Sequence, residues 1–419
     1  DILDKTLRYL GYEVTRAMNI TDVEHLTSDS DSGEDKMMKA TKREHKSAME
    51  IAKFYTEAFF KDLKKLNCKT PEIISNATDN IDMYIKMITK LIDDGYGYIS
   101  GGNVYFDISK LDDYYKLTNH KADEMVVGVR DGVEEDKYKK NQADFALWFT
   151  SSKFEHHELL WDSPWGKGYP GWHIECSGIS IKYLGEKLDI HGGGVDNIFP
   201  HHTNEIAQSE AYLGHKWCNY WFHGEHLNDN TGKMSKSQGE FLTLSLLEEK
   251  GYNPLAYRLF CLNSHYRKVL VFNYDALDQA TNTYNKLVNR IKSIKKESSG
   301  EINQDQINLY QNKFKESLED DLNTANAITI LYDVLKDDEL SNNTQLFLIE
   351  DFDKVLSLGL LNETEIDNDL KTYIEVKINE RNEAKKNKDY ALADKIRDEL
   401  LEKNIVIKDT REETTYEIK

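Results

Sequence analysis

Two hydrophobic patterns divide the chain, and they predict different elements in its two parts. Up to about residue 240, alternating or continuous apolar runs are interspersed with runs of helical spacing, which predicts an α/β region. The strands expected in this part are residues 13–20, 95–107, 144–150 and 217–227. The helices expected in this part are residues 1–10, 51–66 and 79–93. From residue 242 onward the spacing is almost entirely helical, so a helical region is predicted to follow.

Three segments of the α/β part carry more specific expectations. Phe54, Tyr55 and Phe59 fall on the helical repeat of the helix predicted over residues 51–66, so we expect them to pack in the core. The apolar run at residues 144–150 is expected to continue a parallel sheet. Residues 172–174 resemble a strand that ends just before Cys176.

The helical part is divided by residues that end or begin helices. Pro254 suits the first position of a helix, and polar breaks are expected at residues 298–300 and 341–344. Apolar residues at helical spacing predict that the last long helix packs through Leu392, Ala393, Ile396 and Leu400. A short strand is expected at residues 405–407.

Composition and charge narrow the function classes. The chain has 419 residues, which predicts two or three domains, and its formal net charge is −20. This charge argues against a protein that coats nucleic acids without sequence specificity, although local basic patches still permit contact with a particular RNA. The four cysteines are scattered, which favours a reduced, cytoplasmic setting without a disulfide framework. Because no apolar run reaches membrane-spanning length, we expect no membrane association.

The strongest chemical signal is a set of three residues that suit a metal ion. Pro200 favours a helix start, so His201 and Glu205, four residues apart, are expected on one helical face. Together with Cys176 they offer a thiolate, an imidazole and a carboxylate, which are zinc ligands. Each also has an ordinary interpretation, since a lone Cys is usually a small buried residue and a His–Glu pair usually lies on the surface.

Two further motifs suit phosphate groups. Lys-Met-Ser-Lys-Ser at residues 233–237 places two lysines and two hydroxyls on a short loop. Such groups suit the binding of an anionic phosphate leaving group. The alternative is a solvated basic loop. The glycines at 192–194, behind His191, allow a backbone to approach a nucleotide closely, although such a triplet is more often only a turn.

Taken together and in this order, these motifs resemble the cysteinyl-tRNA synthetase family, whose members are class I aminoacyl-tRNA synthetases. Other runs add to the resemblance over nearly the whole chain: Asn-Ile-Thr-Asp at 19–22, Asp-Phe-Ala-Leu-Trp at 144–148, Ser-Pro-Trp-Gly at 163–166, Asn-Glu-Ile-Ala-Gln-Ser at 204–209 and Ser-His-Tyr-Arg at 264–267. The run at residues 388–398 is similar to the terminal helical signature of the family.

The resemblance implies a Rossmann-type class I catalytic domain with an inserted connective peptide, followed by a mostly helical C-terminal tRNA-binding region. The catalytic domain is implied to have a first section at residues 1–96 and a second section at residues 143–240, with the connective peptide at residues 97–142 between them. The second section carries the zinc site and the Lys-Met-Ser-Lys-Ser run at 233–237, called the lysine loop below. A stem-contact connector at residues 241–273 and an anticodon-binding region at residues 274–419 follow.

The same resemblance implies a reaction and a set of site residues. The reaction is ATP-dependent ligation of L-cysteine to tRNA(Cys) through a cysteinyl-adenylate, with Mg²⁺ accompanying ATP and one zinc ion per chain selecting the thiolate. Thr21 and Trp172 are expected beside the substrate cysteine. The residues expected to bind ATP are His191, Gly192, Gly193, Gly194, Asp196 and Lys236. Lys233 and Lys236 are expected to assist catalysis, and the protein is expected to be a monomer.

The sequence departs from the family pattern at its beginning. The zinc-binding cysteine and the His-Ile-Gly-His-type motif near the family's N-terminus are not in these residues, and the first residues match the helix that follows that motif. The chain as printed is therefore expected to be defective in adenylation. Two alternatives stay open at this point: a non-catalytic tRNA-binding paralogue, and a ligase that joins cysteine to an amino-sugar. A ligase that joins cysteine to an amino-sugar does not need the helical region predicted after residue 274, so that region argues against this alternative.

Overall fold

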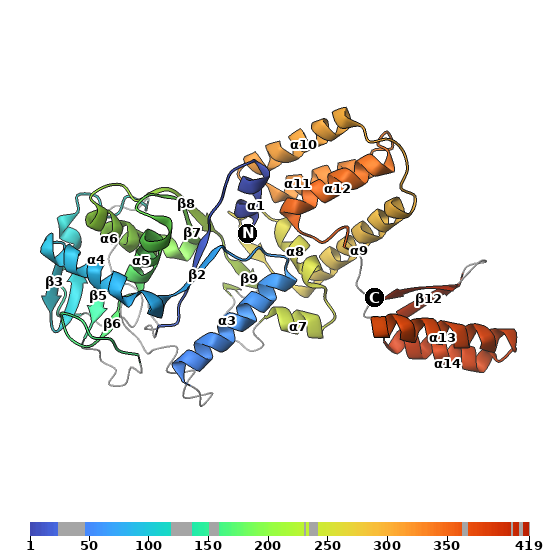
Figure 1. Cartoon of the computed structure of the whole chain (residues 1–419), viewed down its shortest axis with the longest axis horizontal. Helices are drawn as coiled ribbons and strands as arrows, with labels where there is room; N and C mark the ends of the chain where they lie inside the picture. The colour runs from blue at the N-terminus through green and yellow to red at the C-terminus, as the bar shows by residue number, and fades with distance from the viewer. Residues whose placement is uncertain are drawn as a thin grey trace. The chain divides into compact units, whose positions relative to one another are not determined.

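The computed structural model describes most of the chain and divides it into two compact units. The described residues are 1–23, 47–118, 136–150, 159–229, 232–233, 242–362, 368–403, 405–409 and 414–418. The first unit comprises residues 1–361 and the terminal unit residues 362–419. Figure 1 shows the chain coloured from its N-terminus to its C-terminus.

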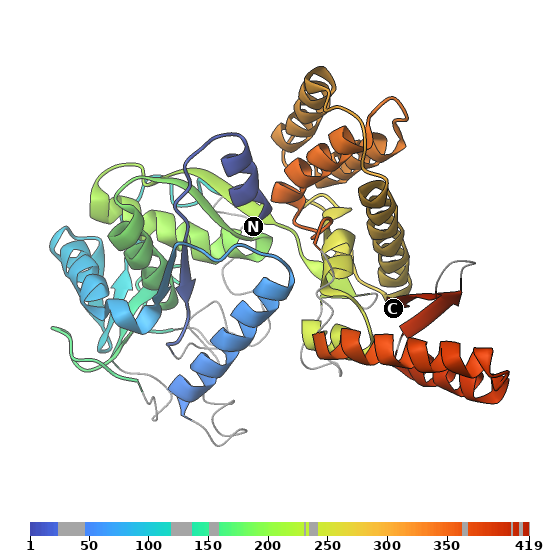
Figure 2. The same cartoon turned by 45° about the vertical axis from the view of Figure 1, so that its right-hand side comes forward.

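Among the described residues, the first unit contains two parallel sheets of two strands each. After helix α1 (Ile2–Tyr9), strand β1 (Ala17–Ile20) pairs with β2 (Ile73–Asn76), and the two lie side by side in Figures 1 and 2. Further along, β7 (Leu188–Gly194) pairs with β8 (Cys218–Gly224). The strand expected over residues 13–20 is therefore formed only in its second half.

A separate antiparallel sheet corrects one expectation about the parallel strands. Its order is β3 (Gly97–Ser100), β4 (Asn103–Phe106), β5 (Phe145–Phe149) and β6 (Tyr169–Pro170). The prediction that residues 144–150 continue a parallel sheet is wrong, because β5 is antiparallel to both of its neighbours. All five β5 residues are buried, so the sequence shows a continuous apolar run like that of a parallel strand.

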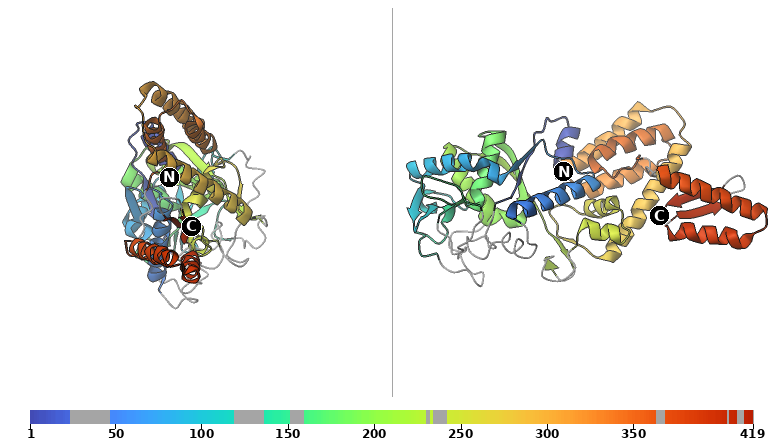
Figure 3. Two further views of the ribbon diagram at one scale, coloured as in Figure 1. Left: turned by 90° about the vertical axis from the view of Figure 1, so that its right-hand side faces the viewer. Right: turned by 60° about the horizontal axis from the view of Figure 1, so that its bottom comes forward.

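Three helices pack together beside these strands and form the core around the candidate site. They are α4 (Ile81–Asp93), α5 (Trp172–Leu184) and α6 (Thr203–Leu213), and Figure 3 shows them as neighbours. The prediction of a strand at residues 172–174 is wrong, because these residues open α5. Residues 173–181 are all buried, so the helix has no polar face to reveal its period, and a short apolar run does not distinguish a strand from a buried helix.

Helix α3 (Ala48–Lys65) begins with a capping box between Ser47 and Glu50, as its sequence favours. Ile51 is buried, but the aromatic side chains of Phe54, Tyr55 and Phe59 are 53%, 45% and 41% exposed. The expectation that these aromatics pack in the core is therefore wrong, although the helix itself is confirmed.

A helical region follows the strands that lead to the lysine loop. The strands β9 (Leu227–Asp229), β10 (Gly232–Lys233) and β11 (Leu270–Val271) form one sheet. Between them lie α7 (Leu244–Glu249) and α8 (Pro254–Leu262), and α8 starts at Pro254 as predicted. The following helices are α9 (Tyr274–Lys296), α10 (Gln304–Glu319), α11 (Thr324–Lys336) and α12 (Asn342–Leu356). They share one apolar core with α8.

The terminal unit is a helical pair with a β-hairpin. Its elements are α13 (Asn368–Lys386), α14 (Tyr390–Glu402), β12 (Ile405–Asp409) and β13 (Thr414–Ile418). Ile396 and Leu400 are buried as predicted, whereas Leu392 is 45% exposed. Among the helices of the described residues, none combines the length and the apolar character that crossing a bilayer requires.

Candidate metal and substrate site

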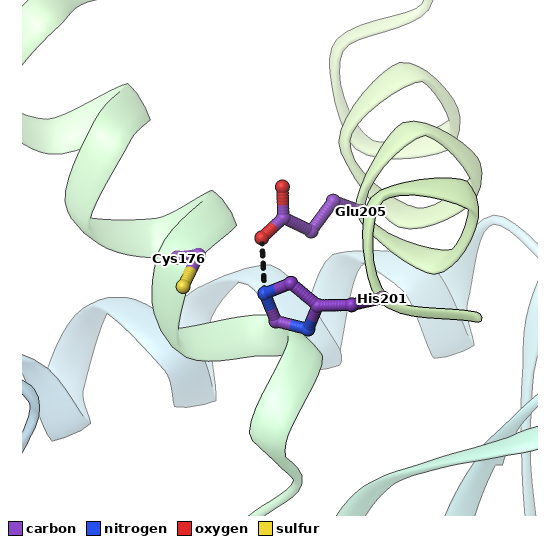
Figure 4. A group of neighbouring side chains, drawn as sticks. All are labelled: Cys176, His201 and Glu205. Atoms are coloured by element: carbon purple, nitrogen blue, oxygen red, sulfur yellow. Dashed lines mark ion pairs between the residues drawn. The ribbon is translucent and has the colours of Figure 1, made fainter. Parts of the chain in front are cut away.

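Cys176, His201 and Glu205 lie together at the meeting of two elements. Cys176 comes from α5, Glu205 from α6, and His201 from the helical turns after Phe199 that lead into α6. Their donor atoms all lie within 4.8 Å of one another. Figure 4 shows the thiol, the imidazole and the carboxylate turned toward one another.

Glu205 carries a fully buried carboxylate between two imidazoles. Its two oxygens lie 2.8 Å from the Nε2 atoms of His201 and His191. Among the described residues, neither oxygen has a partner with hydrogen-bond geometry. Burial acts to raise the pKa of Glu205, but His191 and His201 outweigh it and hold that pKa well below its usual value. An ionised carboxylate in this position suits a bound cation.

The Cys176 thiol responds to the same environment in the opposite sense. Burial, together with the negative charge of Glu205, raises the pKa of Cys176 well above its ordinary value. A cation at the centre of the trio reverses this effect, because metal coordination deprotonates a thiol. The donor set of one sulfur, one imidazole and one carboxylate therefore fits zinc.

His201 is held from two sides by residues of α5. Its Nδ1 lies 2.9 Å from Nδ1 of His173, which leaves Nε2 to face the carboxylate. The ring of Trp172 stacks on the His201 ring, with centroids 4.1 Å apart. Trp172, expected at the substrate, is thus brought to the edge of the trio. His173 was not predicted as a site residue from the sequence. Its position between Trp172 and Cys176 in the Gly-Trp-His-Ile-Glu-Cys run could have indicated it.

A second group of histidines surrounds Glu205. His191, His202 and Glu205 also place their donor atoms within 4.8 Å of one another. Burial lowers the pKa of His202 to about 3, and its Nδ1 lies 2.8 Å from Nε2 of His223. His191 was expected to contact ATP, and the structure places it against Glu205.

The glycines after His191 have close neighbours. A Cβ added to Gly193 would lie 2.8 Å from Cε1 of His202 and 2.7 Å from Nδ2 of Asn197, so this position requires a glycine for packing alone. Gly192, Gly194 and Asp196 lie at the carboxyl end of β7. Ligands bind beyond that end of the strands in open α/β sheets.

The remaining predicted residues are only partly covered by the structure. Thr21 is exposed and directly follows β1, a strand that packs against α5. The backbone of Lys233 belongs to β10, which pairs with β9. Lys236 lies outside the described residues.

Comparisons with known proteins connect this geometry to a family. Residues 1–282 match the model of the tRNA synthetases class I (C) catalytic domain. Residues 313–357 match the DALR domain. The chain is 45% identical to the cysteine--tRNA ligase of Treponema denticola, over 99% of its own length and 90% of that protein. It belongs to the cysteine–tRNA ligases.

Other relatives support the same assignment. The cysteine--tRNA ligase of Borreliella afzelii is 41% identical over 99% of this chain and 89% of its own length. A methionyl-tRNA synthetase of Mycobacterium tuberculosis, solved with methionyl-adenylate, has a TM-score of 0.55 and 14% identity. Its match covers 85% of this chain and 84% of that structure, and at this identity it shows the fold alone.

These comparisons confirm what the sequence predicted at the level of the family. The fold is a class I Rossmann-type catalytic domain followed by a helical anticodon-binding region, and the activity is that of a cysteine–tRNA ligase. The family and its DALR domain imply binding of tRNA(Cys). The expected adenylation defect stays a prediction.

Proposed function

We propose that Cys176, His201 and Glu205 hold one zinc ion that binds the thiolate of the substrate cysteine. The observation that carries this proposal is the convergence of three buried donor atoms of suitable chemistry from α5 and from the turns that open α6. Three protein ligands leave a coordination position for a substrate. When bound, zinc ionises a thiol near neutral pH and prefers it to a hydroxyl, which separates cysteine from serine.

The protein's own residues orient this site. His173 engages Nδ1 of His201, so that Nε2 is the nitrogen left for coordination. The Trp172 ring, stacked on His201, covers the site from the side of α5. We propose that this ring and Thr21 contact the substrate cysteine. An apolar pocket alone separates near-isosteric substrates only weakly, so the donor set is needed for selectivity.

The ATP site is proposed at the carboxyl end of β7. There Gly192, Gly194 and Asp196 lie where nucleotides bind in this fold class, with Mg²⁺ accompanying the phosphates. We further propose that His191 and Gly193 border the nucleoside and that Lys233 and Lys236 neutralise charge on the phosphates. Adenylation needs positioning and charge stabilisation rather than covalent help from the protein.

Contacts with tRNA(Cys) are proposed for the region after residue 241. Its first part, residues 241–273, would contact the acceptor stem, and residues 274–419 would reach the anticodon. Exposed cations in the second half of α9 support this proposal: Lys286, Arg290, Lys292, Lys295 and Lys296. We also propose a monomer located in the cytoplasm.

The zinc proposal is tested with ligand variants of the enzyme expressed from its complete reading frame. Cys176→Ser and His201→Ala are expected to lose bound zinc and to lower the preference for cysteine over serine by about 100-fold. Zinc is measured by mass spectrometry, and selectivity by ATP–pyrophosphate exchange with each amino acid. Cys261→Ser, on α8, serves as the matched control and should retain both properties. Full zinc content and unchanged selectivity in either ligand variant would refute the proposal.

A further inference from the structure

The loop between α10 and α11 has an unusual backbone. Asp321 and Leu322 have φ angles of +52° and +57°, so two consecutive residues other than glycine lie in the left-handed region. Such residues are uncommon, and the associated strain persists only where surrounding contacts fix the conformation. Backbone strain of this kind is often found at functional positions, so the contacts of Asp321 are candidates for a functional role.

Several hydrogen bonds hold this loop in place. The buried hydroxyl of Thr324 donates to the carbonyl of Leu262 at the end of α8, at 2.7 Å. The Leu322 N–H donates to the carbonyl of Leu318, and the Asn323 side chain caps α11 by accepting from the Asn326 N–H. The backbone on both sides of Asp321 is therefore held by contacts with α8, α10 and α11.

The carboxylate of Asp321 binds a single short turn. Its oxygens accept from Arg267 Nε at 2.5 Å, from Arg267 Nη2 at 3.2 Å and from the Tyr266 hydroxyl at 2.6 Å. His265 Nε2 lies 3.8 Å away. These groups belong to the Ser-His-Tyr-Arg run, and the two-point contact with arginine gives the pair a defined geometry.

The opposite side of this turn rests on the strands of the catalytic domain. The Tyr266 ring stacks on Phe222 of β8, with centroids 4.4 Å apart and an angle of 20°. The Tyr266 carbonyl accepts from the Glu225 N–H at 2.8 Å, between β8 and β9. Glu225 leads directly into β9, and β9 pairs with β10, where Asn228 lies opposite Lys233. The turn is therefore connected to Lys233 through Glu225 and β9.

We propose that Asp321 is a positioning residue for adenylation. It holds the turn at residues 265–267 against β8 and Glu225, and through the following strand β9 it orients Lys233 on β10. The helical region proposed to bind tRNA is in this way connected to the strand that carries Lys233. The inference rests on the proposed role of the lysine loop.

Two substitutions separate positioning from mere stability. Asp321→Gly removes the carboxylate, but glycine adopts a positive φ without strain, so the loop itself is not destabilised. Asp321→Asn also tolerates the left-handed region, keeps one acceptor for Tyr266 and loses the charge that faces Arg267. Glu319→Gln, an exposed residue at the end of α10, is the matched control for loss of one negative charge.

The test measures ATP–pyrophosphate exchange in the enzyme expressed from its complete reading frame. For Asp321→Gly we expect kcat to fall about tenfold, while KM for cysteine, zinc content and thermal midpoint stay near those of the wild type. Asp321→Asn should give an intermediate kcat, and Glu319→Gln the wild-type value. An unchanged kcat in Asp321→Gly, or a fall that matches loss of folded protein, would overturn the proposal.

A double-mutant cycle tests the route through Tyr266. Tyr266→Phe keeps the ring stacked on Phe222 and removes only the hydroxyl that donates to Asp321. If Asp321 acts through this contact, Tyr266→Phe lowers kcat less in the Asp321→Gly background than it does in the wild type. Fully additive losses would contradict the route. If Lys236→Ala leaves adenylation intact, the assignment of the loop fails and the inference fails with it. If Lys236→Ala abolishes adenylation while Asp321→Gly leaves kcat unchanged, only the inference fails.

Discussion

At the scale of single residues, Arg258 shows how one side chain joins distant segments. Its guanidinium is buried and donates to the carbonyl of Leu356 at 2.6 Å, to that of Leu66 at 2.9 Å and to the Asp1 carboxylate at 2.8 Å. These contacts connect α8 with the ends of α12 and α3 and with the start of α1. Each of its three nitrogens thus has an acceptor, which offsets the cost of burying the charge.

Arg258→Ala is therefore expected to lower the free energy of unfolding by about 3 kcal/mol, since it leaves buried acceptors unpaired and opens a cavity. Urea denaturation followed by circular dichroism measures the change. Arg290→Ala, an exposed arginine on α9, should shift stability by less than about 0.5 kcal/mol. Equal stabilities of the two variants would contradict the role of Arg258.

At the scale of elements, α5 is the helix on which the candidate metal site depends. It carries Cys176 and packs directly against α4, with Gly178 facing the ring of Tyr84. A Cβ at Gly178 would lie 2.6 Å from a ring carbon of Tyr84. Tyr84 is fully buried, and its hydroxyl donates to the carbonyl of Ala77, so the ring is held in place.

Replacing Gly178 with Ala tests this packing. In an ordinary helix this change stabilises by about 1 kcal/mol, but here we expect a loss of about 1–3 kcal/mol from overpacking. Because Cys176 is two residues away, zinc affinity should fall as well. Gly224→Ala in β8 is a suitable control, since no atom lies within 4 Å of the added Cβ. A more stable Gly178→Ala variant would show that α4 and α5 are less closely packed than described.

At the scale of the whole molecule, the chain consists of two units with separate cores. The core of the terminal unit is formed by buried Ile374, Ile378, Ile396, Leu400 and Ile405. Outside that core, Arg381 binds Asp409 with two parallel hydrogen bonds of 2.8 and 2.9 Å, which ties α13 to the hairpin. The metal trio belongs entirely to the first unit.

Removal of residues 362–419 is therefore expected to affect the two half-reactions differently. Cysteine activation and zinc content should stay near their original values, because no predicted site residue is lost. KM for tRNA(Cys) in aminoacylation should rise about tenfold or more, as contacts beyond the acceptor stem disappear. Steady-state kinetics of both reactions provides the measurement. An unchanged KM for tRNA(Cys) would contradict a role of the terminal unit in binding.

The sequence alone determined the family, the division into an α/β part and a following helical part, and the three residues proposed as metal ligands. It did so because helical spacing fixes that His201 and Glu205 share a face, and because phosphate-binding and metal-binding motifs depend on local residue order. The helical region after residue 242 was equally clear, since its amphipathic helices alternate buried and exposed positions at a regular period.

Only the tertiary structure decided the features that depend on burial from all sides and on distant partners. The helix α5 and the antiparallel strand β5 were misread because a fully buried segment shows no polar face, whatever its conformation. The approach of Cys176 to His201, the support of His201 by His173 and the contact of Asp321 with Arg267 each join separate segments. No local pattern encodes such contacts, because they form only when the helices and strands pack.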